Sequence, residues 1–205
     1  MLVVALTGSL GAGKSTVGRA LAARGAVVVD ADVIARQVTA RGTAGEANVI
    51  RHFGSAVSAP DGGLDRRALA RIVFSDDRER QALEEMTHPL IREEMARLVA
   101  DARASGAQVA VLELPLLDSD RRRQYGVDLV VLVETPVSEA VRRVVQRGLP
   151  EDDARARLAA QPTEAERRSL ADRVFLNTSG LEELDARVDE LWAYLLAVAE
   201  GRQAR

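Results

Sequence analysis

The segment Gly8-Ser9-Leu10-Gly11-Ala12-Gly13-Lys14-Ser15 follows the apolar run of residues 2–6 and decides the fold. It fits the pattern G-x-x-x-x-G-K-[ST], whose glycines let several backbone N–H groups converge on one concavity. A helix beginning near Ser15 would add the positive end of its dipole at the same place. The segment therefore predicts a phosphate-binding loop (P-loop) for a nucleoside triphosphate, built from Gly8, Gly11, Ala12, Gly13, Lys14, Ser15 and Thr16.

Two side chains of this loop have a predicted task of their own. Lys14 can reach the β- and γ-phosphates, and the Ser15 hydroxyl can ligate Mg²⁺. Lys14 is also the single lysine in a chain with 28 lysines and arginines in all, which leaves 27 arginines. Because a compact ammonium and a forked guanidinium are not interchangeable, we expect position 14 to accept only the compact charge.

Composition limits the class of protein. The chain has 205 residues, of which 47% are hydrophobic and 29% charged, and its net charge is −3. That balance is typical of a globular chain and does not favour nucleic acid as a partner. The chain has no cysteine, which excludes disulfides and thiolate metal sites. No apolar run reaches the ~18 residues of a membrane span, and no basic segment precedes the first apolar run, so a cytoplasmic protein is expected.

Short β-branched runs alternate with longer helical segments, which indicates parallel βα units. Near-continuous apolarity of the runs predicts strands covered by helices on both faces. The expected fold is a three-layer α/β/α P-loop NTPase with a five-stranded parallel sheet, a helical substrate-binding insertion and a lid. The expected strands are residues 2–6, 26–30, 108–114, 128–134 and 173–177, and the expected helices are 15–24, 32–40, a cluster within 44–105, 137–147, 150–160, 163–171 and 181–200.

Uneven spacing of the strands predicts the parts of this single P-loop unit. About 77 residues separate the second and third strands, which is too long for a simple crossover. We expect a core of residues 1–30, 106–147 and 172–205, with a helical insertion at 31–105. The polar, arginine-rich segment 148–171 is expected to form a mobile lid, since it offers little apolar surface for packing.

Two acids stand where the second strand ends, at Asp30 and Asp32. Ligands of parallel sheets gather at the carboxyl ends of strands, so both carboxylates should lie beside the loop. Such a carboxylate can accept a proton from an attacking hydroxyl or help to hold Mg²⁺. Asp32 can alternatively cap the helix that follows, and the two roles are compatible.

Several further motifs occur in order along the whole chain, and together they resemble the dephospho-CoA kinase family. The resemblance implies that ATP donates its γ-phosphate to the 3′-hydroxyl of dephospho-CoA, giving CoA and ADP, with Mg²⁺ present. It implies Asp32 as the general base and brings Arg143 and Arg147 to the phosphates from the lid side. The motifs are Asp30-Ala31-Asp32-Val33-Ile34-Ala35-Arg36, His88-Pro89-Leu90-Ile91, Leu114-Pro115-Leu116-Leu117, Arg143 with Arg147, Ala159-Ala160-Gln161, Ala171-Asp172 and Asn177-Thr178-Ser179-Gly180.

The resemblance also suggests roles for residues that have ordinary structural alternatives. It moves His88 toward the acceptor site, whereas the residues alone favour a helix entry, because Pro89 suits the start of a helix. It places Leu116 against the acceptor, where a plain core leucine is the alternative. It puts Asn177 near the adenine of ATP, although such residues also make turns. Glu113 could organise Mg²⁺, but strand alternation can equally turn it away from the site.

Other functions share parts of this pattern. A nucleoside or nucleoside-monophosphate kinase needs the same loop and a similar lid. A GTP-binding switch needs an Asn-Lys-x-Asp motif, which the lone Lys14 excludes. A non-catalytic nucleotide-binding module would not require Asp32 or the arginines of the lid. The family resemblance implies ATP and dephospho-CoA as the partners, and a monomer is the favoured state.

Overall fold

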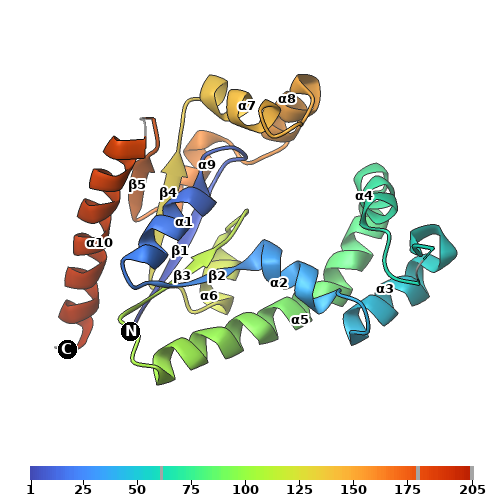
Figure 1. Ribbon diagram of the computed structural model, residues 1–205, viewed down its shortest axis with the longest axis horizontal. Helices are drawn as coiled ribbons and strands as arrows, with labels where there is room; N and C mark the ends of the chain where they lie inside the picture. The colour runs from blue at the N-terminus through green and yellow to red at the C-terminus, as the bar shows by residue number, and fades with distance from the viewer. Residues whose placement is uncertain (61, 179–180, 204–205) are drawn as a thin grey trace. The chain divides into compact units, whose positions relative to one another are not determined.

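The computed structural model describes residues 1–60, 62–178 and 181–203 and contains one parallel five-stranded sheet (Figure 1). The strand order is β2-β3-β1-β4-β5, and every neighbouring pair is parallel. This confirms the expected α/β fold. The strands are β1 (Leu2–Gly8), β2 (Val27–Asp30), β3 (Val109–Glu113), β4 (Leu129–Glu134) and β5 (Arg173–Leu176).

The three central strands, β1, β3 and β4, are buried throughout their length. On one face of the sheet, α1 (Lys14–Ala23) and α10 (Leu181–Gln203) form the main hydrophobic core with them. Val17 and Leu21 of α1 and Leu191 and Leu195 of α10 are almost fully buried in this core. The loop between β1 and α1 is thereby anchored at both ends by well-packed elements.

The outer strand β5 differs from the expectation that helices cover both faces of every strand. Val174 is 38% exposed and Leu176 is 48% exposed. The physical reason is position, because β5 pairs only with β4 and forms one edge of the sheet. Apolarity in the sequence does not distinguish an edge strand from a central one.

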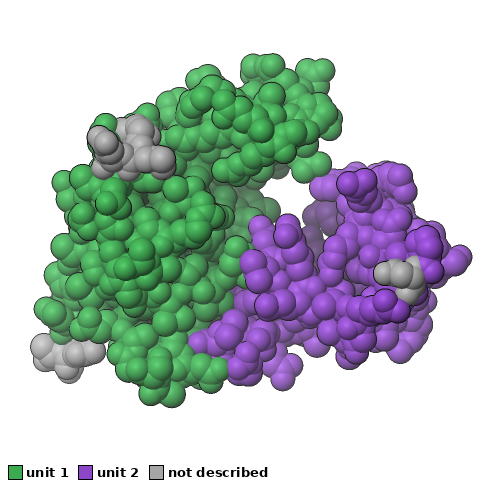
Figure 2. All heavy atoms as spheres, in the orientation of Figure 1, with its two compact units in different colours: residues 1–30, 99–205 green, residues 31–98 purple. Residues whose placement is uncertain are grey.

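Residues 31–98 form a compact unit of their own (Figure 2). The other unit comprises residues 1–30 and 99–205, so the boundary falls inside the long helix α5. A small core of Val49, Val57 and Leu69 lies within the helical segments of residues 31–98. These helices are α2 (Ala31–Val38), α3 (Ala44–Phe53), the 3₁₀ turn η1 (Gly54–Val57), α4 (Arg66–Ser75) and the first part of α5 (Asp77–Ala104).

The prediction that Pro89 begins a helix is wrong. Pro89 lies inside α5, which starts at Asp77 and continues past it. A proline there removes one intrahelical hydrogen bond, the one to the carbonyl of Glu85. Glu85 is exposed, so water can satisfy that carbonyl. A helix of 28 residues carries this single defect.

The segment expected to form a lid contains two helices, α8 (Glu151–Ala159) and α9 (Glu164–Ser169), which follow α7 (Val137–Val145). Val141 and Val144 of α7 form a buried cluster with Ala154 of α8. Leu10 of the loop packs against this cluster, which is more apolar contact than the sequence predicts for the segment. A further short helix, α6 (Ser119–Gln124), precedes β4 and was not predicted.

In the described residues, no helix has the length and apolar character that a membrane crossing requires.

Candidate active site

The loop of residues 9–13 turns sharply between β1 and α1. Gly11 has φ 76° and Gly13 has φ 95°, values that glycine adopts without strain. Neighbouring elements also approach these glycines closely. A Cβ on Gly11 would lie 2.5 Å from the Ala140 carbonyl oxygen, and one on Gly13 would overlap Asn177 Nδ2. Glycine is therefore required at both positions for conformation and for space.

Lys14 begins α1 and lies folded back over the loop. Its Nζ donates to the carbonyl oxygens of Gly8 at 2.7 Å and Ser9 at 3.1 Å. The N-terminus of α1 has no acidic residue in its first turn and no side-chain cap at Gly13. The positive end of the helix dipole at this place favours an anion.

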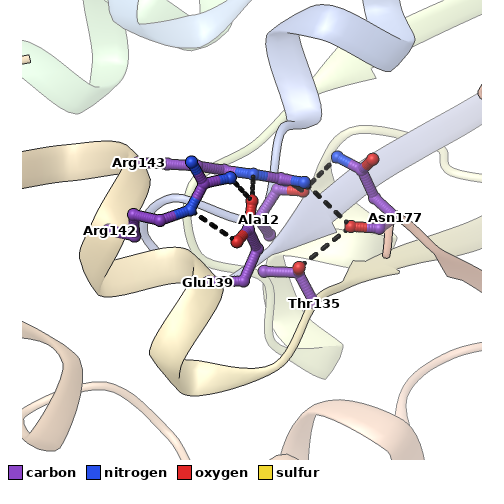
Figure 3. A network of polar contacts seen from close by, with 6 residues as sticks. All are labelled: Ala12, Thr135, Glu139, Arg142, Arg143 and Asn177. Atoms are coloured by element: carbon purple, nitrogen blue, oxygen red, sulfur yellow. Dashed lines mark hydrogen bonds and ion pairs between the residues drawn. The ribbon is translucent and has the colours of Figure 1, made fainter. Parts of the chain in front are cut away.

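A network of polar contacts joins this loop to α7 and to the residues that follow β4 and β5 (Figure 3). Asn177 Nδ2 donates to the Ala12 carbonyl oxygen at 2.7 Å. Arg143 donates from Nη1 to the same oxygen at 3.4 Å and from Nη2 to the Asn177 carbonyl oxygen at 3.1 Å. Thr135 Oγ1 donates to that second oxygen at 2.9 Å. The network brings together two predicted site residues that are 34 positions apart.

The guanidinium of Arg143 is oriented by Glu139, one turn earlier on α7. Arg143 Nε donates to Glu139 Oε1 at 2.8 Å, and Arg142 binds the same carboxylate. Hydrogen bonds from Arg142 and Arg143 lower the pKa of Glu139 to about 2. The carboxylate is therefore ionised at neutral pH and holds Arg143 beside the loop.

A buried acid meets the loop from β3. Glu113 is 7% exposed and accepts a hydrogen bond from the Ser15 hydroxyl. Burial raises the pKa of Glu113, the nearby Asp30 carboxylate raises it further, and the Ser15 hydrogen bond opposes the shift. Asp30 is the register partner of Glu113 on β2. Carboxylate and hydroxyl oxygens are suited to Mg²⁺, so Ser15 and Glu113 could hold this ion.

Strand alternation does not turn Glu113 away from the site. It shares a face of β3 with Val109 and Val111, which lie in the core shared with α1. Its even spacing from those two valines along the strand is the signal in the sequence that shows on which face of β3 the Glu113 side chain lies. In the described part of the chain, no group of three or more His, Asp or Glu residues could hold a metal by itself.

A cavity of about 450 Å³ opens beside the loop at Ser9. The end of β4, the start of α7 and the helices α8 and α9 line it, with apolar groups such as Val137 and Leu158. Glu134 and Arg168 also line the cavity, and they form an ion pair at 2.6 Å. Its size and mixed lining are suited to part of an organic ligand.

The segment of residues 148–171 is also hydrogen-bonded to the loop directly. Gln161 Oε1 accepts a hydrogen bond from the Leu10 N–H at 3.0 Å. Gln161 belongs to the motif Ala159-Ala160-Gln161, for which the sequence indicates no role. The bond joins residues 151 positions apart, which no local pattern indicates.

Two of the other predicted site residues belong to the unit of residues 31–98, namely Asp32 and His88. Asp32 is the second residue of α2 and is exposed. His88 lies half-buried in α5.

Leu116 and Arg147 belong to the other unit and do not join the network of Figure 3. Leu116 follows β3 and is 43% exposed, which is unlike a core leucine. Arg147 lies just past the end of α7 with an exposed side chain. Thr16 Oγ1 accepts from Arg19 at 3.5 Å. Ser179 and Gly180 of the last motif lie outside the described residues.

Comparison with known proteins extends these observations. A family model described as dephospho-CoA kinase matches residues 2–183. A dephospho-CoA kinase of Frankia casuarinae is 48% identical over 98% of this chain and 87% of its own length. One of Thermobifida fusca is 44% identical over 95% of this chain and 96% of its own. The solved structure of a dephospho-CoA kinase from Campylobacter jejuni superposes with a TM-score of 0.70 at 23% identity, covering 98% of both chains, and shares the fold.

Proposed function

The chain belongs to the dephospho-CoA kinase family, and we propose that its P-loop holds ATP while Asp32 activates the acceptor. The reaction of the family moves the γ-phosphate of ATP to the 3′-hydroxyl of dephospho-CoA, giving CoA and ADP in the last step of coenzyme A biosynthesis. Such a transfer needs a phosphate-binding loop, a base, a metal site and an acceptor site, and residues of this chain are suited to each of them.

The phosphate-binding part rests on the geometry around Lys14. Its ammonium lies within hydrogen-bond distance of two loop carbonyls, so the positive charge stays over the concavity. Backbone N–H groups of the loop and the N-terminus of α1 supply the remaining donors. Phosphoryl transfer is catalysed mainly by positioning and charge neutralisation, which this arrangement provides. This geometry is the single observation that carries the proposal.

Asp32 is proposed as the general base. It follows the carboxyl end of β2 by two residues and stands in the first turn of α2 with an exposed side chain. The proton that it would accept is the one on the 3′-hydroxyl of the ribose.

Ser15 and Glu113 are proposed as the residues that hold Mg²⁺. Their fit is indicated by the buried Glu113 carboxylate, whose pKa burial raises and whose hydrogen-bond partner is a hydroxyl of the loop. A cation nearby would compensate the cost of burying that charge. When bound, Mg²⁺ neutralises charge on the phosphates.

The remaining assignments follow the division of the chain. We propose that residues 31–105 bind the acceptor, with His88 contributing from α5, and that Leu116 after β3 also contacts the acceptor. Residues 148–171 are proposed as the lid, with Arg143 and Arg147 acting on the phosphates from its base. A forked guanidinium suits that role because it can bind two oxygens at once.

The substitution Asp32→Ala tests the base. We expect kcat to fall by at least ~10²-fold, the scale of losing a general base, while ATP affinity is retained. The matched control is Asp120→Ala, which removes an exposed aspartate paired with Arg123 on α6. A near-normal kcat in Asp32→Ala would show that Asp32 takes no part in the chemical step.

The acceptor is tested by ADP release. Dephospho-CoA should support turnover, and AMP, other nucleoside monophosphates and nucleosides should not. Turnover with these alternatives alone would favour the nucleoside or nucleoside-monophosphate kinase that shares the loop and lid.

A further inference from the structure

The carbonyl oxygen of Ala12 is held from outside the loop. Asn177 Nδ2 donates to it at 2.7 Å, and Arg143 supports the same oxygen at 3.4 Å. Asn177 is only 5% exposed and Ala12 is fully buried. The contact is therefore a buried hydrogen bond across 165 positions of the chain, not a surface turn.

The main chain of Asn177 is fixed in turn. Its N–H donates to the Glu134 carbonyl oxygen at 2.7 Å, which continues the pairing of β4 with β5. Its carbonyl oxygen accepts from Thr135 and Arg143 (Figure 3). The backbone N–H, the backbone carbonyl and the side chain of Asn177 are thus all engaged in hydrogen bonds.

Fixing the carbonyl of a peptide also fixes the direction of its N–H. The Ala12–Gly13 peptide is trans and planar, so its N–H points opposite to its carbonyl. Because Asn177 and Arg143 bind the carbonyl, the Gly13 N–H faces away from them. Within the described part of the chain, no acceptor is bonded to this N–H. A donor that the fold orients but does not use is available to a ligand.

We propose that Asn177 is a positioning residue of the phosphate site, which acts through the Ala12–Gly13 peptide and directs the Gly13 N–H to a phosphate oxygen. The inference rests on the proposed function of the loop. It differs from the expectation that Asn177 lies against the adenine of ATP, because its carboxamide is already bonded to the loop. It also gives a reason for Gly13, since a Cβ there would overlap Asn177 Nδ2.

The two assignments of Asn177 are separated by ligands that carry only one half of ATP. Inorganic tripolyphosphate has phosphates and no base, and adenosine has a base and no phosphate. In Asn177→Ala and in the shape-matched Asn177→Leu, we expect tripolyphosphate to bind at least about tenfold more weakly, the scale of losing a hydrogen bond to a charged group. Adenosine should bind within about twofold of the wild type, because the base is not involved.

The binding of both ligands is measured by calorimetry on the full chain, together with the melting temperature of each variant. In kinetics, KM for ATP should rise while KM for dephospho-CoA stays constant. The control Asn48→Ala removes the other asparagine of the chain, which accepts only a local bond from Arg51 on its own helix, and should leave tripolyphosphate binding unchanged.

Unchanged tripolyphosphate binding in both Asn177 variants would overturn the inference. So would an equal loss of both ligands, which would mean a base contact or a general loss of structure. Failure of the wild-type chain to bind tripolyphosphate is a separate result, because it would contradict the proposed phosphate loop itself.

Discussion

Gly18→Ala provides a sharp test of the link between Glu113 and the loop. Gly18 lies in the middle of α1, where alanine would normally favour the helix. Here the added methyl would lie 2.8 Å from Glu113 Cδ and closer still to Oε1, whereas ordinary contacts begin near 3.4 Å. The carboxylate has to withdraw by at least about 0.6 Å, and the Ser15 hydrogen bond is strained or lost.

Two opposing free energies decide the stability of this variant. Alanine in place of glycine stabilises a helix interior by about 1 kcal/mol. Losing a hydrogen bond to a charged group costs about 1.5–3 kcal/mol. The expected net change is a destabilisation of about 0.5–2 kcal/mol, which lowers the melting temperature by roughly 1–8 °C in a chain of this size. The kinase reaction should also need more Mg²⁺ for half-maximal rate, since Glu113 no longer faces Ser15.

Thermal unfolding and kcat as a function of Mg²⁺ concentration measure the two effects. The matched control is Gly201→Ala in α10, where an added Cβ meets nothing within 4 Å. The control should be neutral or slightly stabilising, with unaltered Mg²⁺ dependence. If Gly18→Ala behaves like this control in both measurements, the reasoning about Glu113 and Ser15 is refuted.

Three further changes have expected outcomes. Lys14→Arg should lower kcat by at least ~10²-fold in the ADP-release assay, because a guanidinium cannot replace the compact charge. Glu113→Gln should stabilise the ligand-free chain at neutral pH. Burial raises the pKa of Glu113 in the folded chain above its ordinary 4.5, so the free-energy cost of ionising the buried carboxylate is full only above the raised pKa. Urea unfolding should therefore show no increase in the free energy of unfolding for this variant below pH 4.5. Arg168→Leu leaves buried Glu134 unpaired and should cost about 1–2 kcal/mol, restored in part by adding Glu134→Gln.

The fold was largely predictable because its signals are local. Apolar runs separated by helical segments identify all five strands to within one or two residues at each end, and the glycine pattern fixes the loop after β1. The errors lie where the local signal is ambiguous. Pro89 has the same chemistry at the start of a helix and inside a long one, and only the continuation of α5 on both sides decides between them.

The candidate site was predictable in part. The loop residues follow from their pattern, but the partners of the loop come from distant positions. Asn177 contacts Ala12, and Gln161 contacts Leu10, although more than 150 residues separate each pair. Such contacts depend on strand order and register. The local periodicity of a single sequence gives neither of them. The resemblance to a family placed Asn177 near the adenine of ATP and gave Gln161 no role, and it indicated neither contact with the loop.

These distant partners explain why the loop pattern alone does not make a phosphate site. The backbone of Gly13 can adopt many conformations, and that freedom works against holding one N–H in a fixed direction. Asn177 restricts the loop at the Ala12–Gly13 peptide, and Glu113 holds the Ser15 hydroxyl two residues later. Both restraints come from the carboxyl ends of strands in the same parallel sheet, β5 and β3. A glycine-rich loop removed from this sheet would keep its flexibility and lose the preorganised donors, so we attribute the strength of the site to the strand ends as much as to the loop.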